Sequence, residues 1–365
     1  MKKIKVLMSS TNSYTKNGVT NVMLNLFRNI DKTDIRIDFV AIEEPDDNIR
    51  LEIEAAKSKI TVVPRSIRHF IRFISRFSKV CKGYDIVHVH GNSATIALEL
   101  FAAKKAGIKT RIAHSHNSTC KFKKLDILCR IPFYALCNGY LACGQKAGEW
   151  LFGKRGFQVI NNGIDTEKFA FDQKKRYVIR DKLGWHSNKI IGHVGNFVEA
   201  KNHTLILDIF ADAYQKDNNC RLLLLGDGRL KQDIMKKAQA LKIADMVCFV
   251  GNTDYVADYL CAMDLVLMPS LFEGLPLALV EEQSNGLKCI VSDAITTDVD
   301  LTGNLIFIPL YAEIVKWSNV ILNLDIDMDR TLVSNNAIAL IKKKGFDSRQ
   351  SACQLEKYYL EQNLL

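Results

Sequence analysis

Short apolar runs alternate along the chain with longer segments in which apolar positions recur every three or four residues. The run at residues 4–8 is too short for a helix and is followed by a polar loop, so it predicts a buried strand. Over residues 20–29, Val22, Leu26 and Phe27 share one side of a helical projection, which predicts an amphipathic helix. Strand, loop and helix then repeat, and this alternation is typical of doubly wound α/β sheets.

The same pattern locates further strands in both halves of the chain. A chain of 365 residues, 48% of them hydrophobic, can build two domains that each have a core. A polar, charged connection is expected at residues 166–188, and a helix at residues 347–360. The predicted strands are residues 35–42, 60–63, 140–143, 157–160, 190–195, 221–225, 246–250, 265–268, 288–292 and 305–308, with strand ends also at 85–91 and 111–117.

Residues 264–282 combine a strand, a loop and the start of a helix with two carboxylates. The apolar strand ends at Pro269, and Pro276 suits the first turn of a helix. A helix N-terminus offers free N–H donors and a partial positive charge, which favour a phosphate or sugar hydroxyls. Glu273 lies at this N-terminus and Glu281 follows eight positions later, so the stretch predicts a nucleotide-sugar site. Both glutamates can equally be first-turn residues that stabilise the helix dipole.

Two pairs of histidines close two of the predicted strands. Side chains alternate along a strand, so His88 and His90 share one face, as do His114 and His116. The later member of each pair lies nearer the carboxyl end, which is the edge where parallel sheets bind ligands. His90 and His116 are therefore candidate site residues, and His88 and His114 are interpreted as structural.

Residues 65–79 predict a basic amphipathic helix, and residues 118–139 form a second basic and apolar stretch. In the first helix, cations recur in steps of three and four with apolar residues on the other side. This pattern is typical of a segment that lies on an anionic bilayer. A helix that packs its apolar side on the core and leaves a solvated basic side gives the same pattern. The cations are Arg65, Arg68, Arg72, Arg76 and Lys79, and the apolar residues are Ile67, Phe70, Ile71, Ile74 and Phe77.

The chain is basic, with a net charge of +10, and the charge is unevenly divided. Residues 1–165 contain 27 Lys and Arg against 14 Asp and Glu, whereas residues 166–365 contain 23 against 26. This asymmetry indicates that the first half meets an anionic partner. The chain shows neither a signal h-region nor the roughly 20 apolar residues of a membrane span, which predicts a cytoplasmic protein. Ten cysteines without C-x-x-C spacing predict reduced core residues.

Short motifs follow one another in order along nearly the whole chain. They are Asn17-Gly18-Val19, Ile86-Val87-His88-Val89-His90-Gly91, Asn162-Gly163-Ile164-Asp165, Gly195-Asn196-Phe197 with Lys201, Leu225-Gly226-Asp227-Gly228, Phe249-Val250-Gly251 and the E-x7-E stretch from Glu273 to Glu281. Together they resemble the retaining glycosyltransferases of family GT4. The resemblance implies a GT-B fold, in which two Rossmann-like, doubly wound parallel-sheet domains face a central cleft. It also implies the transfer of a sugar from a nucleotide-sugar.

The resemblance further implies a role for each matching residue. Glu273 holds sugar hydroxyls, Glu281 the ribose and Lys201 the diphosphate. His116 lies beside the transferred sugar, and the catalytic group is then His116, Glu273 and Lys201. His90 and Asn117 belong to the acceptor side. The implied donor site comprises Gly18, Asn196, Lys201, Gly226, Val250, Gly251, Asn252, Glu273, Gly274, Leu275, Pro276, Leu277 and Glu281.

The phosphate-binding stretch departs from the family pattern at one position. The family usually has an arginine directly after the glycine, where this chain has Asn196, so the expected phosphate clamp loses one charge. Lys201 remains, and an amide still donates. We expect no metal, because Asp325-Ile326-Asp327 is interpreted as a solvated turn. Lys201 and the helix-end amides are then expected to offset the charge of the leaving diphosphate.

The expected organisation is an acceptor-side domain of residues 1–164, a nucleotide-sugar-binding domain of residues 165–345 and a C-terminal helix in residues 346–365 that returns to the first domain. The expected partners are a UDP-linked donor, a saccharide or polyprenyl-linked saccharide acceptor of cell-surface polysaccharide synthesis, and the anionic inner face of the plasma membrane, with no nucleic acid. Two alternatives stay open. One is a GT-B UDP-sugar epimerase, against which the E-x7-E motif argues, and the other is a basic module that binds nucleic acid or membrane without catalysis.

Overall fold

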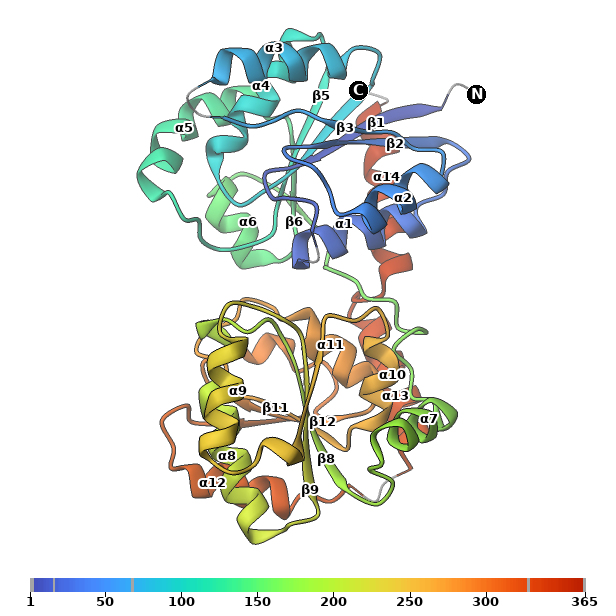
Figure 1. Cartoon of the computed structure of the whole chain (residues 1–365). Helices are drawn as coiled ribbons and strands as arrows, with labels where there is room; N and C mark the ends of the chain where they lie inside the picture. The colour runs from blue at the N-terminus through green and yellow to red at the C-terminus, as the bar shows by residue number, and fades with distance from the viewer. Residues whose placement is uncertain (1–2, 16, 67–68, 327–328, 364–365) are drawn as a thin grey trace. The chain divides into compact units, whose positions relative to one another are not determined.

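A computed structural model describes residues 3–15, 17–66, 69–326 and 329–363, so Arg68 and Asp327, named above, lie outside the described residues. The chain divides into two compact units, Met1–Gly163 with Gly345–Leu365, and Ile164–Lys344. Each unit is a parallel sheet between two layers of helices (Figure 1). The predicted α/β class with two doubly wound parallel sheets is therefore confirmed. All ten cysteines are free.

The first unit is built on a seven-stranded sheet in the order β3-β2-β1-β4-β5-β6-β7. Its strands are β1 (Ile4–Ser10), β2 (Ile35–Ala41), β3 (Ile60–Val62), β4 (Ile86–His90), β5 (Thr110–Ser115), β6 (Gly139–Ala142) and β7 (Gln158–Val159). Its helices are α1 (Gly18–Asn29), α2 (Asp47–Ala55), α3 (Phe70–Cys81), α4 (Ala97–Lys105), α5 (Lys123–Leu136), α6 (Gln145–Phe152) and α14 (Ser348–Asn363).

The two faces of the first sheet carry different helices. Helices α3 to α6 pack on one face around a core that includes Phe77, Leu100, Phe133 and Phe152. Helices α1 and α14 lie side by side on the other face (Figure 1). The central strands β1 and β4 are buried on both faces, which is why they are mainly apolar, although β4 also buries His88 and His90.

Helix α14 packs in the first unit although it follows the second unit in the sequence. The Tyr140 amide donates to the Tyr358 hydroxyl at 3.0 Å, and the Tyr359 hydroxyl lies 2.6 Å from Nδ1 of His88. A Cβ atom on Gly163 would lie 2.6 Å from the backbone of Asp347, so only glycine fits where the chain approaches the start of α14.

The second unit is built on a six-stranded sheet in the order β10-β9-β8-β11-β12-β13. Helices α8, α9 and α12 cover one face, and α7, α10, α11 and α13 cover the other (Figure 1). The strands are β8 (Lys189–Val194), β9 (Cys220–Leu225), β10 (Val247–Gly251), β11 (Leu265–Met268), β12 (Lys288–Ser292) and β13 (Leu305–Ile308). The helices are α7 (Gln173–Leu183), α8 (His203–Lys216), α9 (Lys231–Ala240), α10 (Val256–Ala262), α11 (Leu277–Ser284), α12 (Ile314–Leu322) and α13 (Arg330–Lys343).

The expected polar connection contains a helix, α7, that the apolar pattern did not reveal. The Asp172 side chain caps its N-terminus by accepting two backbone amides. Arg176 and Arg180 reach the buried carboxylate of Asp264 at 2.5 and 2.6 Å. Ion pairs to a residue more than eighty positions away hold this helix to its unit, so its sequence has no strong apolar stripe.

Helix α3 starts later than the basic stretch predicts, at Phe70. Arg65 precedes the helix, and its guanidinium pairs with the buried carboxylate of Glu99 at 2.7 Å. The expectation that Arg65 belongs to a membrane-facing basic helix is therefore wrong, because its guanidinium lies outside α3 and is paired with the carboxylate of Glu99. Arg68 and Ile67 lie outside the described residues.

Candidate active site

The loops at the carboxyl edge of the second sheet pack tightly because they are rich in glycine. The Gly226 amide donates to the Gly251 carbonyl at 3.0 Å, which links the ends of β9 and β10. A Cβ atom on Gly226 would lie 2.2 Å from the Gly195 carbonyl oxygen, and one on Gly228 would lie 2.6 Å from that of Phe197. Only glycine permits this approach, which gathers the ends of β8, β9 and β10 at the edge where parallel sheets bind ligands.

Lys201 and Glu273 form an ion pair beside these loops, with 2.5 Å between Nζ and Oε1. The Ser270 hydroxyl donates to the same carboxylate oxygen at 3.1 Å. The Leu271 amide donates to the Ala200 carbonyl at 2.8 Å, so the loop after β8 is joined to the loop after β11. The two side chains are 18% and 14% exposed, which leaves the pair largely desolvated but accessible to a ligand.

Helix α11 starts directly after Pro276, and its first-turn amides have no partner within the helix. The loop that precedes it exposes Gly274 and partly exposes Leu275. Glu281 lies further along the helix and is partly exposed. Burial raises the pKa of Glu281 to about 7, and the nearby Lys168 ammonium opposes that rise.

Other predicted donor residues lie around the same edge. Asn196 and Asn252 are exposed, and Val250 is partly exposed. Lys231, which is not among the residues predicted from the sequence, brings a second ammonium group to these loops. Its Nζ lies 3.2 Å from a carboxylate oxygen of Asp227. The sequence does contain a signal for Lys231, because this lysine follows the Gly226-Asp227-Gly228 motif by three positions.

Glu282, next to Glu281, is another residue of this site that was not predicted from the sequence. Its side chain is fully buried, and Oε1 has no hydrogen-bond partner. Burial raises its pKa well above the ordinary value, and the charge of Glu281 adds to the rise. Burial therefore favours the protonated form of Glu282, although its sequence position looks like that of any exposed helical glutamate.

In the first unit, Gly18 is the first residue of α1, after an N-cap at Asn17 whose side chain accepts the Thr20 amide at 3.0 Å. A Cβ atom on Gly18 would meet no atom within 4 Å. Packing among the described residues therefore does not require glycine here, and the space beside Gly18 is open.

Four histidines on β4 and the end of β5 form a stacked array. His90 Nδ1 and His116 Nε2 share a hydrogen bond at 2.7 Å, and the rings of His114 and His116 stack with centroids 4.4 Å apart. His88 closes the array against Tyr359 of α14. Burial lowers the pKa of His116 to about 4 and that of His88 to about 3. The array is therefore uncharged at pH 7, and only His116 is partly exposed.

His116 and Asn117 follow β5 in a short loop. The His116 amide donates to the Asn92 side chain at 3.0 Å, and the Ser118 amide donates to that of Asn117 at 2.8 Å. These contacts place His116 beyond the carboxyl end of β5, next to His90 at the end of β4.

Among the described residues, His88, His90 and His114 are a group with ligand atoms within 4.8 Å of one another. Histidine nitrogens are suitable zinc ligands. The ring planes of His88 and His114 differ by 7°, and those of His88 and His90 by 27°. Nitrogen lone pairs lie in the ring plane, so stacked rings do not direct them at one point. The arrangement fits a packed array better than a metal centre.

Two doubly wound units with ligand-binding loops at a sheet's carboxyl edge are the architecture of the GT-B class, and solved structures share it. HepE from Anabaena, solved in complex with UDP, has a TM-score of 0.81 at 18% identity, over 98% of this chain and 100% of that chain. WaaG, a glycosyltransferase involved in lipopolysaccharide biosynthesis, has a TM-score of 0.68 at 13% identity, over 96% and 98%. The predicted GT-B fold is confirmed.

The family follows from sequence comparison. Residues 16–168 match Glycosyltransferase Family 4, and residues 175–301 match Glycosyl transferases group 1. The chain is 32% identical over 329 residues to the putative glycosyltransferase EpsF of Bacillus subtilis (strain 168), covering 84% of each. It is 31% identical over 227 residues, 58% of each, to the UDP-Gal:alpha-D-GlcNAc-diphosphoundecaprenol alpha-1,3-galactosyltransferase of Escherichia coli. The chain belongs to glycosyltransferase family GT4 and is a retaining glycosyltransferase, which sets aside the epimerase and the module without catalysis.

Proposed function

We propose that this enzyme transfers a sugar from a UDP-sugar to a saccharide or polyprenyl-linked saccharide, in cell-surface polysaccharide synthesis at the inner face of the plasma membrane. The relative from Escherichia coli is named for a UDP-Gal donor and a diphosphoundecaprenol acceptor. HepE has also been solved with UDP-glucose. Within this chain, the observation that carries the proposal is the Lys201–Glu273 pair beside the glycine-rich loops.

The ion pair suggests how a donor is held. Lys201 and Glu273 neutralise each other, and a diphosphate in this site competes for the Lys201 ammonium. Glu273 is then free to accept hydrogen bonds from sugar hydroxyls. Lys201 and the first-turn amides of α11 offset the charge that develops on the leaving diphosphate, a role that needs no protein-bound metal in this proposal.

Retention normally suggests a carboxylate nucleophile on the far face of the sugar. The E-x7-E motif assigns both glutamates to binding, Glu273 to the sugar and Glu281 to the ribose. We therefore propose that the acceptor attacks from the same face as the leaving group. His116, His90 and Asn117 keep their predicted roles on the sugar and acceptor side, where a neutral His116 exchanges hydrogen bonds rather than carrying charge.

Thermal unfolding with added nucleotides tests the donor assignment. We expect UDP and UDP-sugars to raise Tm, because a ligand that binds only the folded protein stabilises it, and GDP and ADP to raise it less. Lys201→Ala should abolish the shift. Lys236→Ala is the matched control, because Lys236 lies in the same unit in an exposed ion pair. Equal shifts with all three nucleotides, or a full UDP shift in Lys201→Ala, would contradict the proposal.

A further inference from the structure

Helix α5 turns large aliphatic side chains to solvent. Ile127, Leu128 and Ile131 lie on one side of the helix and are 67%, 75% and 83% exposed. The opposite side buries Phe133 and Leu136 in the core. Three such side chains on adjacent turns form an apolar patch, and patches of this kind mark interaction sites more often than surfaces that meet only water.

A basic segment leads into this patch. Phe122, directly before α5, is also exposed, and so are Lys121, Lys123 and Lys124 around it. Aliphatic and aromatic side chains beside lysines are the composition of helices that lie in the interface of an anionic membrane.

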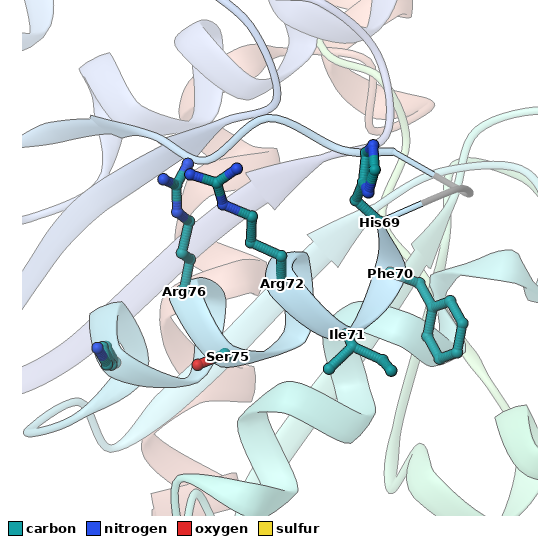
Figure 2. Close-up of a pocket in the computed structure, with 7 residues that line it drawn as sticks. His69, Phe70, Ile71, Arg72, Ser75 and Arg76 are labelled. Atoms are coloured by element: carbon teal, nitrogen blue, oxygen red, sulfur yellow. The ribbon is translucent and has the colours of Figure 1, made fainter.

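Helix α3 presents cations on its exposed side. Its apolar residues Phe73, Ile74 and Phe77 are buried, which agrees with the core-packed alternative for that side. Phe70 and Ile71, at its N-terminus, stay exposed. Figure 2 shows the guanidinium groups of Arg72 and Arg76 on one side of the helix and Phe70 and Ile71 on the other. They line a hollow of about 500 Å³ together with His69 and Ser75.

Helix α4 connects the two surfaces. It packs against both α3 and α5, on the same face of the first sheet (Figure 1). It exposes Phe101 between them, together with Lys104 and Lys105. The outward sides of α3, α4 and α5 therefore form one basic and apolar face, which we call the α3–α5 face.

The acidic residues in the part of the sequence that contains α3, α4 and α5 are buried or partly buried, and each is bound by a partner within the protein. Between residues 55 and 148 the sequence has three of them, Asp85, Glu99 and Asp126. Glu99 and Asp126 are buried, and Asp85 is partly buried. Their partners are the amide of Lys5 for Asp85, Arg65 for Glu99 and Arg130 for Asp126, at 2.8, 2.7 and 2.9 Å. The cations on the α3–α5 face thus have no exposed carboxylate from this region beside them.

We propose that the α3–α5 face docks on an anionic lipid bilayer, with the aliphatic side chains of α5 inserted and the cations of α3 on the headgroups. Charge complementarity favours this occupant over a second copy of the chain, which would bring two basic faces together. The most exposed apolar side chains of the face are the aliphatic Ile127, Leu128 and Ile131 of α5, which can insert into a bilayer but do not stack with nucleic-acid bases. Within the described ranges, no helix has the length and hydropathy of a membrane span. The inference rests on the membrane location in the proposed function but not on the donor chemistry, so vesicle binding and the UDP-induced Tm shift can fail separately.

Co-sedimentation with vesicles of phosphatidylglycerol and phosphatidylcholine tests the proposal, with pure phosphatidylcholine vesicles as the comparison. The parent should bind the anionic vesicles and less so as salt rises, because salt screens exposed charges. Ile127→Ser/Leu128→Ser/Ile131→Ser should weaken binding at least tenfold at every salt concentration. Arg72→Gln/Arg76→Gln/Lys79→Gln should remove mainly the salt-dependent part. The matched control replaces the exposed residues Val178, Tyr311 and Leu332 of the second unit by serine and should bind like the parent.

Three outcomes would overturn the inference. They are a parent that ignores anionic vesicles at low salt, an α5 variant that binds like the parent, and an α5 variant that instead loses self-association or RNA binding. The last would assign the face to a second copy or to nucleic acid. The Tm shift by UDP, measured on each variant, shows that the protein is folded and reports on the donor site independently.

Discussion

Glu281 and Glu282 show how two adjacent, identical side chains acquire different chemistry. Glu281 is partly exposed, burial raises its pKa to about 7, and the nearby Lys168 ammonium opposes that rise. Glu282 is fully buried beside the Cys289 thiol, 4.0 Å away. Because full burial disfavours the charged form, the pKa of Glu282 is raised well above its ordinary value, whereas Glu281 ionises near neutral pH.

Glu281→Gln should weaken the binding of UDP and of UDP-sugars alike. If Glu281 accepts hydrogen bonds from the ribose, the loss is about 1–3 kcal/mol, which is the cost of an unmade charged hydrogen bond. Isothermal titration calorimetry with UDP measures it. Glu313→Gln, at an exposed position in the same unit, is the control. An unchanged affinity in Glu281→Gln would remove this residue from the donor site.

Glu282→Gln should stabilise the protein, and more so as pH rises. The unfolded chain releases the Glu282 proton near pH 4.5, whereas the folded protein keeps it to a higher pH because burial raises the pKa. Glu282 therefore costs stability that grows as pH rises above 4.5, by up to about 1.4 kcal/mol per pH unit. Urea unfolding of both proteins at pH 5, 6.5 and 8 measures the difference. A difference that stays constant over this range would show that Glu282 ionises normally in the folded state.

Turnover should persist in excess EDTA. Lys201 and the α11 amides are proposed to offset the diphosphate charge, so the chemical step needs no divalent ion. UDP release in the presence of a lipid-linked acceptor measures turnover. Activity that is lost in EDTA and restored by Mg²⁺ or Mn²⁺ would reject this account of the leaving group.

Among the helices, α7 is held to its unit mainly through charge. Arg176 and Arg180 converge on Asp264, which lies just before β11 and also accepts the Ile190 amide at 2.7 Å. The side chains of Arg180 and Asp264 are each only 7% exposed. A charge network this buried is far more sensitive to the loss of one member than an exposed pair is.

Asp264→Ala should destabilise the protein by about 3–5 kcal/mol, because it leaves two guanidinium groups without their carboxylate. Asp233→Ala is the control, since Asp233 pairs with Lys236 on an exposed surface, where an ion pair contributes about 0–1 kcal/mol. Urea unfolding measures both. Arg176 and Arg180 also donate to the Ala262 carbonyl, at 3.2 and 3.0 Å. A loss in Asp264→Ala no larger than in the control would show that such backbone acceptors alone are enough for the two arginines.

For the molecule as a whole, α14 makes the first unit depend on the last residues of the chain. Tyr359 is fully buried in that unit and touches His88. The second unit, Ile164–Lys344, is continuous in sequence and contains most of the predicted donor residues.

A chain that ends at Lys344 should therefore lose the first unit and keep the second. Limited proteolysis should degrade residues before 164 and leave a protected fragment that still binds UDP by calorimetry. The full-length chain, protected in both units, is the reference. Cooperative unfolding of the whole truncated chain, with no UDP binding, would show that the second unit needs the first.

Local sequence predicted the strands well because most of them are buried on both faces. Residues 265–268, 288–292 and 305–308 are strands with the predicted bounds. Strands that are mostly buried are mostly apolar, so the limits of these three runs can be seen without knowledge of a partner, although buried β4 also carries His88 and His90. The family motifs also indicated the loops that carry the candidate site, and the structure places Lys201 beside Glu273.

Contacts between distant residues could not be predicted in this way. Arg65 fits the three- and four-residue spacing of the cations in the predicted basic helix, but in the structure it forms an ion pair with Glu99. Helix α7 has no apolar stripe because Asp264 holds it. In these cases the partner lies more than thirty positions away, and a local pattern contains no information about it.

The α/β class and the family could be recognised from the sequence, because periodic apolar positions and short motifs are local properties. The satisfied charges and the side chains left at the surface became known from the folded structure. Glu282 is buried with a raised pKa, and Ile127, Leu128 and Ile131 are exposed, against their ordinary preferences. Local patterns do not contain these facts, because burial and pairing depend on neighbours that folding brings from distant parts of the chain.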